Sequence, residues 1–222
     1  MRGLFVTGTG TGVGKTILSA ALVAAMRAAG EPVRAYKPVV TGLDEPAGEW
    51  PPDHELLGLA AGMDANEVAP LRYGPAVSPH LAAQMAGERI DPAALVARAR
   101  EHAGRTLVVE GVGGLLVPLA EGYSVRDLAV ELALPLVIAA SPELGTINHT
   151  LLTIESARAV GLDVCAVVLT PWTNKPTAMT ISNRETIARR GGVEVCVLSE
   201  AAGGDPSELA QLGASMPWQH WL

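Results

Sequence analysis

The sequence contains few aromatic and few basic residues, and both shortages exclude kinds of partner. Aromatic residues make up only 4% of the 222 residues, with a single Phe, so a stacking surface for single-stranded nucleic acid is not expected. The chain has 16 Lys plus Arg and 23 Asp plus Glu, which gives a formal net charge of −7. Proteins that coat nucleic acid or anionic lipid usually carry a net positive charge. We therefore expect no nucleic acid and no membrane as partner, although the balance still allows a local basic pocket for a phosphate.

Cysteine and long apolar runs are also scarce. The two cysteines, Cys165 and Cys196, each lie in an apolar run without the spacing of a disulfide framework or a zinc site, so we expect two buried, reduced thiols. No stretch reaches the roughly 18 uninterrupted apolar residues of a membrane span. The segment before the first glycine-rich loop is too short for a signal peptide. These absences predict a cytoplasmic protein.

Apolar runs alternate with helical patterns along the chain. Runs that are apolar on both faces, as in a parallel sheet covered by helices, predict strands at Gly3–Thr7, Val33–Pro38, Thr106–Val109, Leu136–Ala140, Val164–Leu169 and Val193–Leu198. Periodic segments predict helices at Lys15–Ala29, Asp53–Gly62, Ser78–Ala86, Asp91–Ala103, Ser124–Leu134, Ile147–Val160 and Met179–Arg190, with Val39–Pro52 as a loop. Ser78 and Asp91 are expected helix caps, because a proline follows each at the first helical position. The alternation predicts a single α/β domain over residues 1–222, a doubly wound and mostly parallel sheet of about seven strands.

The most informative segment is glycine-rich and runs from Gly8 to Thr16, with the sequence GTGTGVGKT. It joins the first predicted strand to the first predicted helix, which is the context of a phosphate-binding loop and makes the fold P-loop NTPase-like. Glycines allow backbone N–H groups and the helix N-terminus to face phosphate oxygens. Lys15 would then reach the β- and γ-phosphates, and the Thr16 hydroxyl would bind Mg²⁺. The expected nucleotide contacts here are Gly12, Val13, Gly14, Lys15, Thr16 and Ile17.

The spacing of this loop departs from the common G-x-x-x-x-G-K-[ST] form. Thr9 stands where that form has its first glycine, and the nearest glycine is Gly8, one residue further upstream. The alternative interpretation is a glycine-rich turn with a threonine that caps the helix.

Two further strand ends carry charged residues and are expected at the same edge of the sheet, where open α/β folds bind ligands. Glu110 ends a buried strand and is followed by Gly111, Val112 and Gly113, so it could place a carboxylate beside a phosphate-bound metal ion. Lys37 lies at the end of the second predicted strand and could neutralise a transferring phosphoryl group or an anionic acceptor. Taken alone, each has an ordinary explanation, a strand-end Glu before a glycine turn and a surface Lys.

Four segments together resemble the dethiobiotin synthetase family of biotin synthesis: Val6–Thr16, Tyr36–Gly42, Val109–Val117 and Leu144–Thr150. They follow the family's order, and the six-residue step from Gly8 to Gly14 is the family's own form of the loop. The resemblance implies a cyclo-ligase that converts 7,8-diaminopelargonate, CO2 and a nucleoside triphosphate into dethiobiotin, nucleoside diphosphate and phosphate. One amine would capture CO2 as a carbamate, the carbamate oxygen would attack the γ-phosphoryl group, and the second amine would close the ureido ring on the resulting carbamic–phosphoric anhydride.

The resemblance also implies residue roles. It makes Lys15, Lys37 and Thr11 catalytic, because the carbamate and the triphosphate are both anions that must approach each other. It assigns Mg²⁺, which prefers oxygen ligands, to Thr16, Asp53 and Glu110; Asp53 could instead simply cap its helix.

Substrate contacts are implied at two places. Thr11, Lys37 and Thr41 would contact the diamine or the carbamate. The family builds each site at a homodimer interface, where a helix start equivalent to Gly145, Thr146, Ile147 and Asn148 holds the substrate carboxylate from the partner chain; the alternative is an ordinary capped helix start. His80 and His149 show no metal spacing and are expected to be structural.

The chain departs from the family where the base is bound. An Asn is expected after the strand at 164–169, but Thr170 and Pro171 follow it, and Pro has no N–H to donate. Asn174 and Asn183 lie further along. By analogy Thr170, Pro171, Ser199, Glu200 and Ala201 would flank the base, and the co-substrate could be ATP or another triphosphate such as CTP.

Three other functions share such a loop. Partition or positioning ATPases usually carry an extra Lys early in the loop, where this chain has Thr9 and Gly10. Glutamine-dependent cobyrinate-amidating enzymes add a glutaminase domain for which the chain has no length. A small-molecule kinase is the remaining alternative.

Overall fold

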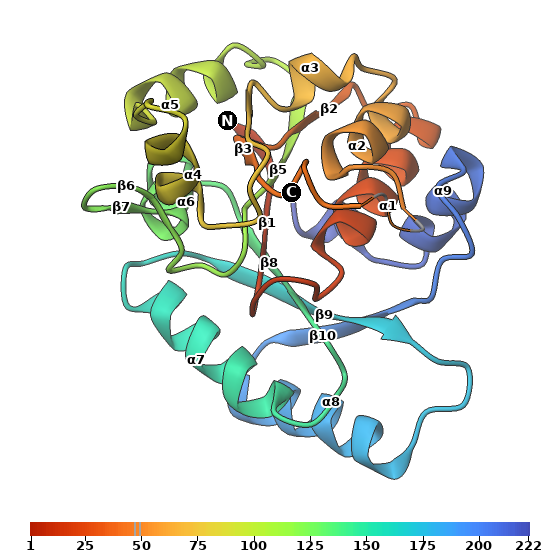
Figure 1. Ribbon diagram of the computed structural model, residues 1–222. Coiled ribbons are helices and arrows are strands. Elements are labelled where there is room, and N and C mark those ends of the chain that lie inside the picture. The colour runs from red at the N-terminus through yellow and green to blue at the C-terminus, as the bar shows by residue number, and fades with distance from the viewer. Residues whose placement is uncertain (47, 49) are drawn as a thin grey trace.

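The protein is built on a central parallel sheet (Figure 1). The computed structural model describes residues 1–46, 48 and 50–222. Within them, six strands pair in the order β10-β9-β8-β1-β5-β2. Their bounds are β1 Arg2–Gly8, β2 Val33–Tyr36, β5 Thr106–Glu110, β8 Leu136–Ala140, β9 Val164–Trp172 and β10 Glu194–Ser199. The predicted α/β fold is confirmed, and the main sheet has six described strands where about seven were expected.

Helices cover both faces of this sheet (Figure 1). One face carries α1 (Lys15–Ala28), α2 (Asp53–Ala61), α3 (Ala65–Val68) and α9 (Pro206–Ala214). The other carries α4 (Pro79–Met85), α5 (Pro92–Arg100), α6 (Val125–Leu132), α7 (Thr146–Arg158) and α8 (Ala178–Gly191). A 3-10 turn at Trp218–His220 adds Trp218 to the first face. The layers are therefore those of a doubly wound fold.

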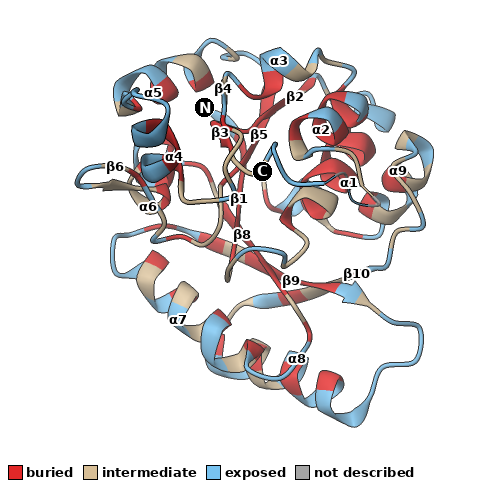
Figure 2. Cartoon of the chain, in the orientation of Figure 1, coloured by how far each residue is buried: buried red, intermediate tan, exposed pale blue. Residues whose placement is uncertain are grey.

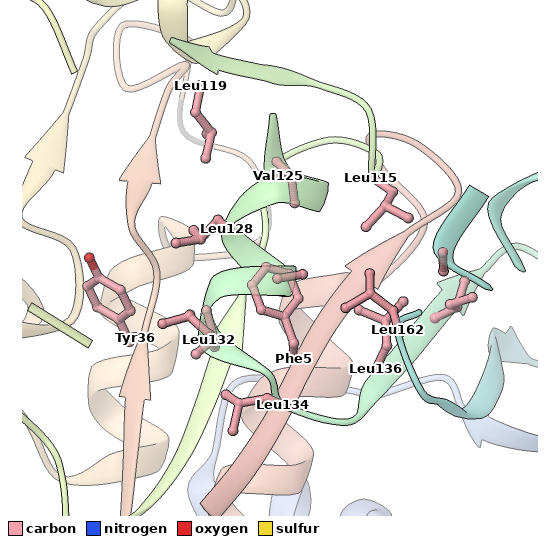
Figure 3. Packing of buried hydrophobic residues seen from close by; sticks show 14 of the residues in the cluster. Phe5, Tyr36, Leu115, Leu119, Val125, Leu128, Leu132, Leu134, Leu136 and Leu162 are labelled. Atoms are coloured by element: carbon pink, nitrogen blue, oxygen red, sulfur yellow. The ribbon is translucent and has the colours of Figure 1, made fainter. Parts of the chain in front are cut away.

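The strand β1 shows why the sheet is buried on both sides. Successive side chains of a strand point to opposite faces. Leu4 and Val6 lie in the core beneath α1, whereas Phe5 lies in the opposite core, and all three are fully buried. Figure 3 shows Phe5 packed among leucines of the opposite core, including Leu128 of α6. In Figure 2 the ribbon of the central strands is coloured as buried over most of its length.

The strand register brings the predicted site segments to one edge. Val6 pairs with Glu110 of β5, and Thr7 pairs with Ile138 of β8, so the ends of these strands coincide. The neighbouring strands β1 and β5 then lead to helices on opposite faces, α1 and α6. Such a divergence opens a crevice at the carboxyl ends of the strands, which is where α/β sheets bind ligands.

Several small elements differ from the sequence-based expectation. The segment predicted as a loop from 39 to 52 contains β3 (Val39–Val40), which pairs with β4 (Leu71–Arg72); Ala47 and Glu49 of that segment lie outside the described residues. A hairpin of β6 (Pro118–Ala120) and β7 (Tyr123–Ser124) precedes α6. These pairs were missed because two or three residues are too few to show a period.

The expected caps are present at the starts of α4 and α5. Ser78 and Asp91 are the N-cap residues, each followed by a proline, and the Asp91 carboxylate accepts a hydrogen bond from the Ala93 N–H. Both cysteines are free, as expected, but they are half-buried rather than buried. Desolvation raises the pKa of the Cys165 thiol to about 12. Among the described residues, no helix is long and apolar enough to cross a membrane.

Candidate nucleotide and substrate site

The glycine-rich loop wraps from β1 to the first turn of α1. Gly14 is the N-cap of α1 with φ +82°, a conformation that favours glycine. A β-carbon at Gly14 would lie 2.6 Å from the Thr170 methyl carbon. The end of β9 is therefore packed directly on the loop, and only a residue without a side chain fits between them.

A network of charges lies beneath this loop and is centred on Lys37, which is buried. The Lys37 Nζ donates to Oε1 of Glu110 at 2.6 Å and lies 2.7 Å from Oδ2 of Asp53. The hydroxyl of Thr16, in the first turn of α1, donates to the same Oε1 of Glu110 at 2.8 Å. Four segments that are separate in sequence thus meet at one ammonium group and one buried carboxylate.

Lys15 belongs to the same site but faces the loop. Its side chain is also buried, and its Nζ donates to the Gly10 carbonyl at 2.7 Å. Two cations and two carboxylates therefore share one region, in which Lys15, Lys37 and Glu110 are buried and Asp53 is partly exposed. The remaining lysine of the chain, Lys175, is exposed.

Burial and charge act in opposite directions on these pKa values. Burial alone would lower the pKa of Lys37, but Glu110 and Asp53 together raise it above the ordinary value. Burial likewise favours the neutral form of Asp53, yet Lys37 holds the pKa of this carboxyl below its usual range. For Lys15, burial outweighs the attraction of Glu110, and its pKa is lowered. Lys37 is thus fixed as a cation at physiological pH.

The oxygen atoms of this site fit a hard divalent cation. Glu110 is fully buried, and its Oε2 has no hydrogen-bond partner among the described residues. A buried, unpartnered carboxylate oxygen is costly unless a ligand satisfies it. Asp53 is 44% exposed at its side chain and opens to the cleft. Within the described residues no cluster of three His, Cys, Asp or Glu is present, so a hydroxyl such as that of Thr16 would complete the donor set.

A cleft of about 620 Å³ runs over the loop and this charge network. Its walls include most of the residues predicted for this edge, namely Thr11, Gly12, Gly14, Lys15, Thr16, Ile17, Lys37, Thr41, Asp53, Val112 and Gly113. Of the nucleotide contacts predicted at the loop and at the end of β5, three do not line it: Val13 packs against the core under α1, Glu110 lies buried beneath Lys37 and Thr16, and Gly111 packs at the end of β5.

A second cavity of about 270 Å³ adjoins the loop at the end of β9. It is lined by Thr170, Pro171, Glu200 and Ala201, together with Ala202 and Gly203. Ser199 was expected here, but it ends β10 and is not among the described lining residues. Asn183 is buried on α8 and donates to the Pro142 carbonyl at 2.9 Å, and Asn174 is exposed.

The start of α7 lies apart from the cleft within one chain. Thr146 is buried at this helix start, while Gly145 and Asn148 are exposed, and none of the three lines the cleft, nor does half-buried Ile147. A third cavity of about 540 Å³ reaches from the loop towards α7 and includes His149 and Leu152. His80 is exposed on α4.

Several lining residues were missed by sequence reasoning, because no charge or motif marks them. They are Trp50, Pro51, Leu56, Ala76, Val77, Ser78, Pro79 and Val117 in the cleft, and Ala202 and Gly203 in the second cavity. Ser78 and Pro79 were predicted as a helix start. The sequence did not show that the pairing of β3 with β4 would place this helix start at the cleft.

Comparison with known proteins identifies the family. A family model described as an AAA domain matches residues 2–198. The ATP-dependent dethiobiotin synthetase BioD of Mycobacterium sp. (strain JLS) is 38% identical over 226 residues, covering 100% of this chain and 98% of that protein. The chain belongs to the dethiobiotin synthetase family. The match extends over the full length, beyond the four segments in the first part of the chain that indicated it.

Two other comparisons are consistent with membership of the dethiobiotin synthetase family. The ATP-dependent dethiobiotin synthetase BioD of Mycobacterium tuberculosis (strain CDC 1551 / Oshkosh) is 37% identical over 224 residues, covering 99% of this chain and 96% of that protein. The crystal structure of the cell division protein FtsY from Thermotoga maritima superposes with a TM-score of 0.50 at 13% identity, over 97% of this chain and 69% of that one. At this identity the second likeness concerns the fold alone.

Proposed function

We propose that this protein is a Mg²⁺-dependent dethiobiotin synthetase that carboxylates and cyclises 7,8-diaminopelargonate at the expense of a nucleoside triphosphate. The proposal is supported most directly by Lys37, a buried ammonium held 2.6 Å and 2.7 Å from two carboxylates below a glycine-rich loop. The proposed reaction is the one that the family membership implies. The cleft supplies the kind of site that the reaction needs, a place where two anions meet.

The lysines bring these anions together. One amine of the substrate adds to CO2 and loses a proton, which gives a carbamate; a carbamate oxygen then attacks the γ-phosphorus, and the nucleoside diphosphate leaves. Charge develops on the oxygens of the transferring group, and fixed cations stabilise it best where water is excluded. We assign this task to Lys15 and Lys37, with Lys15 on the phosphate side, and the Thr11 hydroxyl as a donor to the substrate.

Ring closure completes the reaction at the same place. The second amine attacks the carbonyl carbon of the carbamic–phosphoric anhydride, its proton is lost, and inorganic phosphate leaves. Thr41 lines the same cleft as Lys37, so its hydroxyl is placed to orient one of the two amines. Such positioning converts the last step into an intramolecular reaction, which lowers its entropic cost.

Thr16, Asp53 and Glu110 would hold Mg²⁺. When bound with the nucleotide, the ion supplies charge neutralisation on the phosphates. The protein's own contribution is to keep these oxygens together, and Lys37 performs this by bridging the two carboxylates. The triphosphate is ATP or another nucleotide such as CTP, because no side-chain amide stands at the end of β9 where the family places one.

We further propose that a homodimer completes the site, with the start of α7 of one chain holding the substrate carboxylate for the other. Leu144 precedes this start and Leu152 lies further along α7, and they are 88% and 55% exposed. The third cavity joins the cleft at Thr11 and Val117, which line both. A second chain packed on this face would cover the leucines and close that opening.

A mass-spectrometric product assay tests the function. The protein is mixed with diaminopelargonate, bicarbonate, Mg²⁺ and ATP, with CTP in a parallel reaction. We expect dethiobiotin and phosphate, and the ratio of the two reactions measures the base preference. Lys37→Ala should abolish product, while Lys175→Ala, at an exposed lysine, should not. Nucleotide hydrolysis without dethiobiotin would contradict the proposal and favour a kinase or a positioning ATPase.

A further inference from the structure

The cleft over the glycine-rich loop and the second cavity at the end of β9 share part of their walls. Four described residues line both: Gly12, Gly14, Ile17 and Trp50. The glycines contribute only backbone atoms, so Ile17 and Trp50 are the residues of this shared wall that carry side chains. Trp50 is also the one aromatic residue among the described lining residues of either cavity.

Two features fix the position of the Trp50 side chain: its packing against the core and the two prolines that follow it. Trp50 is half-buried and packs, together with Ile17, against the core beneath α1. Pro51 and Pro52 follow it, and their rings fix the backbone up to Asp53, the first residue of α2. The indole position is therefore coupled to that of the carboxylate that pairs with Lys37.

The second cavity has few side-chain groups that could read the edge of a base. Pro171 has no backbone N–H, and the Ala202 N–H already donates to Oε1 of Glu208 at 2.6 Å. Asn183, a side-chain amide of the kind that reads adenine, is turned to the Pro142 carbonyl. Among the described lining residues, Thr170 and Glu200 carry the polar side chains that remain for a base edge, and Trp50 adds an aromatic face.

We propose that Trp50 positions the nucleoside by packing its indole against the base, while the loop holds the phosphates. This inference rests on the proposed nucleotide-dependent function and adds a residue that positions the co-substrate. Stacking on an aromatic side chain accepts any base, because every base has a π-face. Trp50 would therefore support binding of purine and of pyrimidine triphosphates alike.

The test separates the contribution of the nucleoside to binding affinity from that of the phosphates. Affinities for a β,γ-imido analogue of ATP, the equivalent analogue of CTP and inorganic tripolyphosphate are measured by calorimetry with Mg²⁺. We expect Trp50→Ala to weaken both nucleotides about tenfold, equivalent to about 1.4 kcal/mol, and Trp50→Phe to restore most of this affinity. Tripolyphosphate, which lacks a nucleoside, should bind wild type and variants equally.

Tryptophan fluorescence supplies a second readout. The nucleotide-induced change should disappear in Trp50→Phe and persist in Trp172→Phe, because Trp172 lines neither cavity. Equal nucleotide affinity in Trp50→Ala and wild type would overturn the inference, and so would an equal loss for nucleotide and tripolyphosphate, which would indicate a damaged loop. Absence of any nucleotide binding by the wild type would instead refute the proposed function itself.

Discussion

The bridge made by Lys37 predicts a large and specific stability change in Lys37→Met. Methionine keeps the length of the side chain but removes its charge, and Glu110 then remains fully buried with only the Thr16 hydroxyl as donor. Breaking a buried ion pair from one side costs about 3–5 kcal/mol. Because the Thr16 hydroxyl still donates to Glu110, we expect a loss in the free energy of unfolding near the lower limit, about 3 kcal/mol. For a domain of this size this corresponds to a melting temperature about 6–12 °C lower.

Urea unfolding at neutral pH, without nucleotide or Mg²⁺, measures this loss. Lys175→Met is the matched control, because Lys175 is exposed and such changes usually stay within about 0.5 kcal/mol. Lys37→Met combined with Glu110→Gln removes the unpaired charge and should recover most of the stability, with a coupling energy above about 1.5 kcal/mol. Lys37→Met unfolding like the Lys175 control would refute the idea that the bridge holds the site together.

The shifted pKa values also predict how the stability contributed by Lys37 and Asp53 changes with pH. The raised pKa of Lys37 means that its contribution is full below the ordinary lysine value and is lost only as pH rises through the higher folded-state value. The lowered pKa of Asp53 means that its contribution is full above the ordinary aspartate value and is lost as pH falls through the lower folded-state value. Lys37→Met should therefore show a weaker loss of stability on acidification than the wild type.

Three other changes test separate parts of the site. Glu110→Gln should raise the Mg²⁺ concentration needed for half-maximal turnover at least about tenfold; an unchanged Mg²⁺ titration would remove Glu110 from the metal site. Gly14→Ala should cost about 1–3 kcal/mol in urea unfolding and weaken nucleotide binding, because of its φ of +82° and the nearby Thr170 methyl; Gly10→Ala, with open space around it, is the control. Leu152→Asp should give a monomer by light scattering, whereas Leu59→Asp, equally exposed at 55% on α2, should leave the mass unchanged; a monomeric wild type would exclude the dimer.

The sequence predicted best those features that follow from strand ends. Lys37 and Glu110 were expected at one edge because parallel strands share their carboxyl ends, and the structure places the Lys37 Nζ 2.6 Å from Oε1 of Glu110. The contact with Asp53 was not foreseen, since it depends on the path of the segment between β3 and α2. Asp53 was expected either to cap its helix or to bind a metal ion, and its Oδ2 lies 2.7 Å from the Lys37 Nζ.

Other elements were missed for different physical reasons. Helix α9 was not predicted, although Asp205 and Pro206 have the same cap-and-proline pattern that marked α4 and α5, and the Asp205 carboxylate accepts from the Ser207 N–H. This signal was present and could have been used. Trp50 had no comparable signal in the sequence, because a single aromatic residue in a proline-rich segment has no period. The other residues of its cavity come from the glycine-rich loop and α1, from β9 and from the segment after β10.

The central position of β1 has a consequence for how the protein is made. Its two neighbours in the sheet, β5 and β8, begin at Thr106 and Leu136, and α1 packs closely on α9, where a β-carbon at Gly213 would lie 2.0 Å from the Ala21 carbonyl oxygen. A ribosome adds about 5–20 residues per second, so β1 waits for seconds before either neighbouring strand exists. The phosphate loop is thus among the earliest segments translated and among the latest to acquire its shape. We therefore expect that a nascent chain cannot bind nucleotide before β5 and β8 have been made.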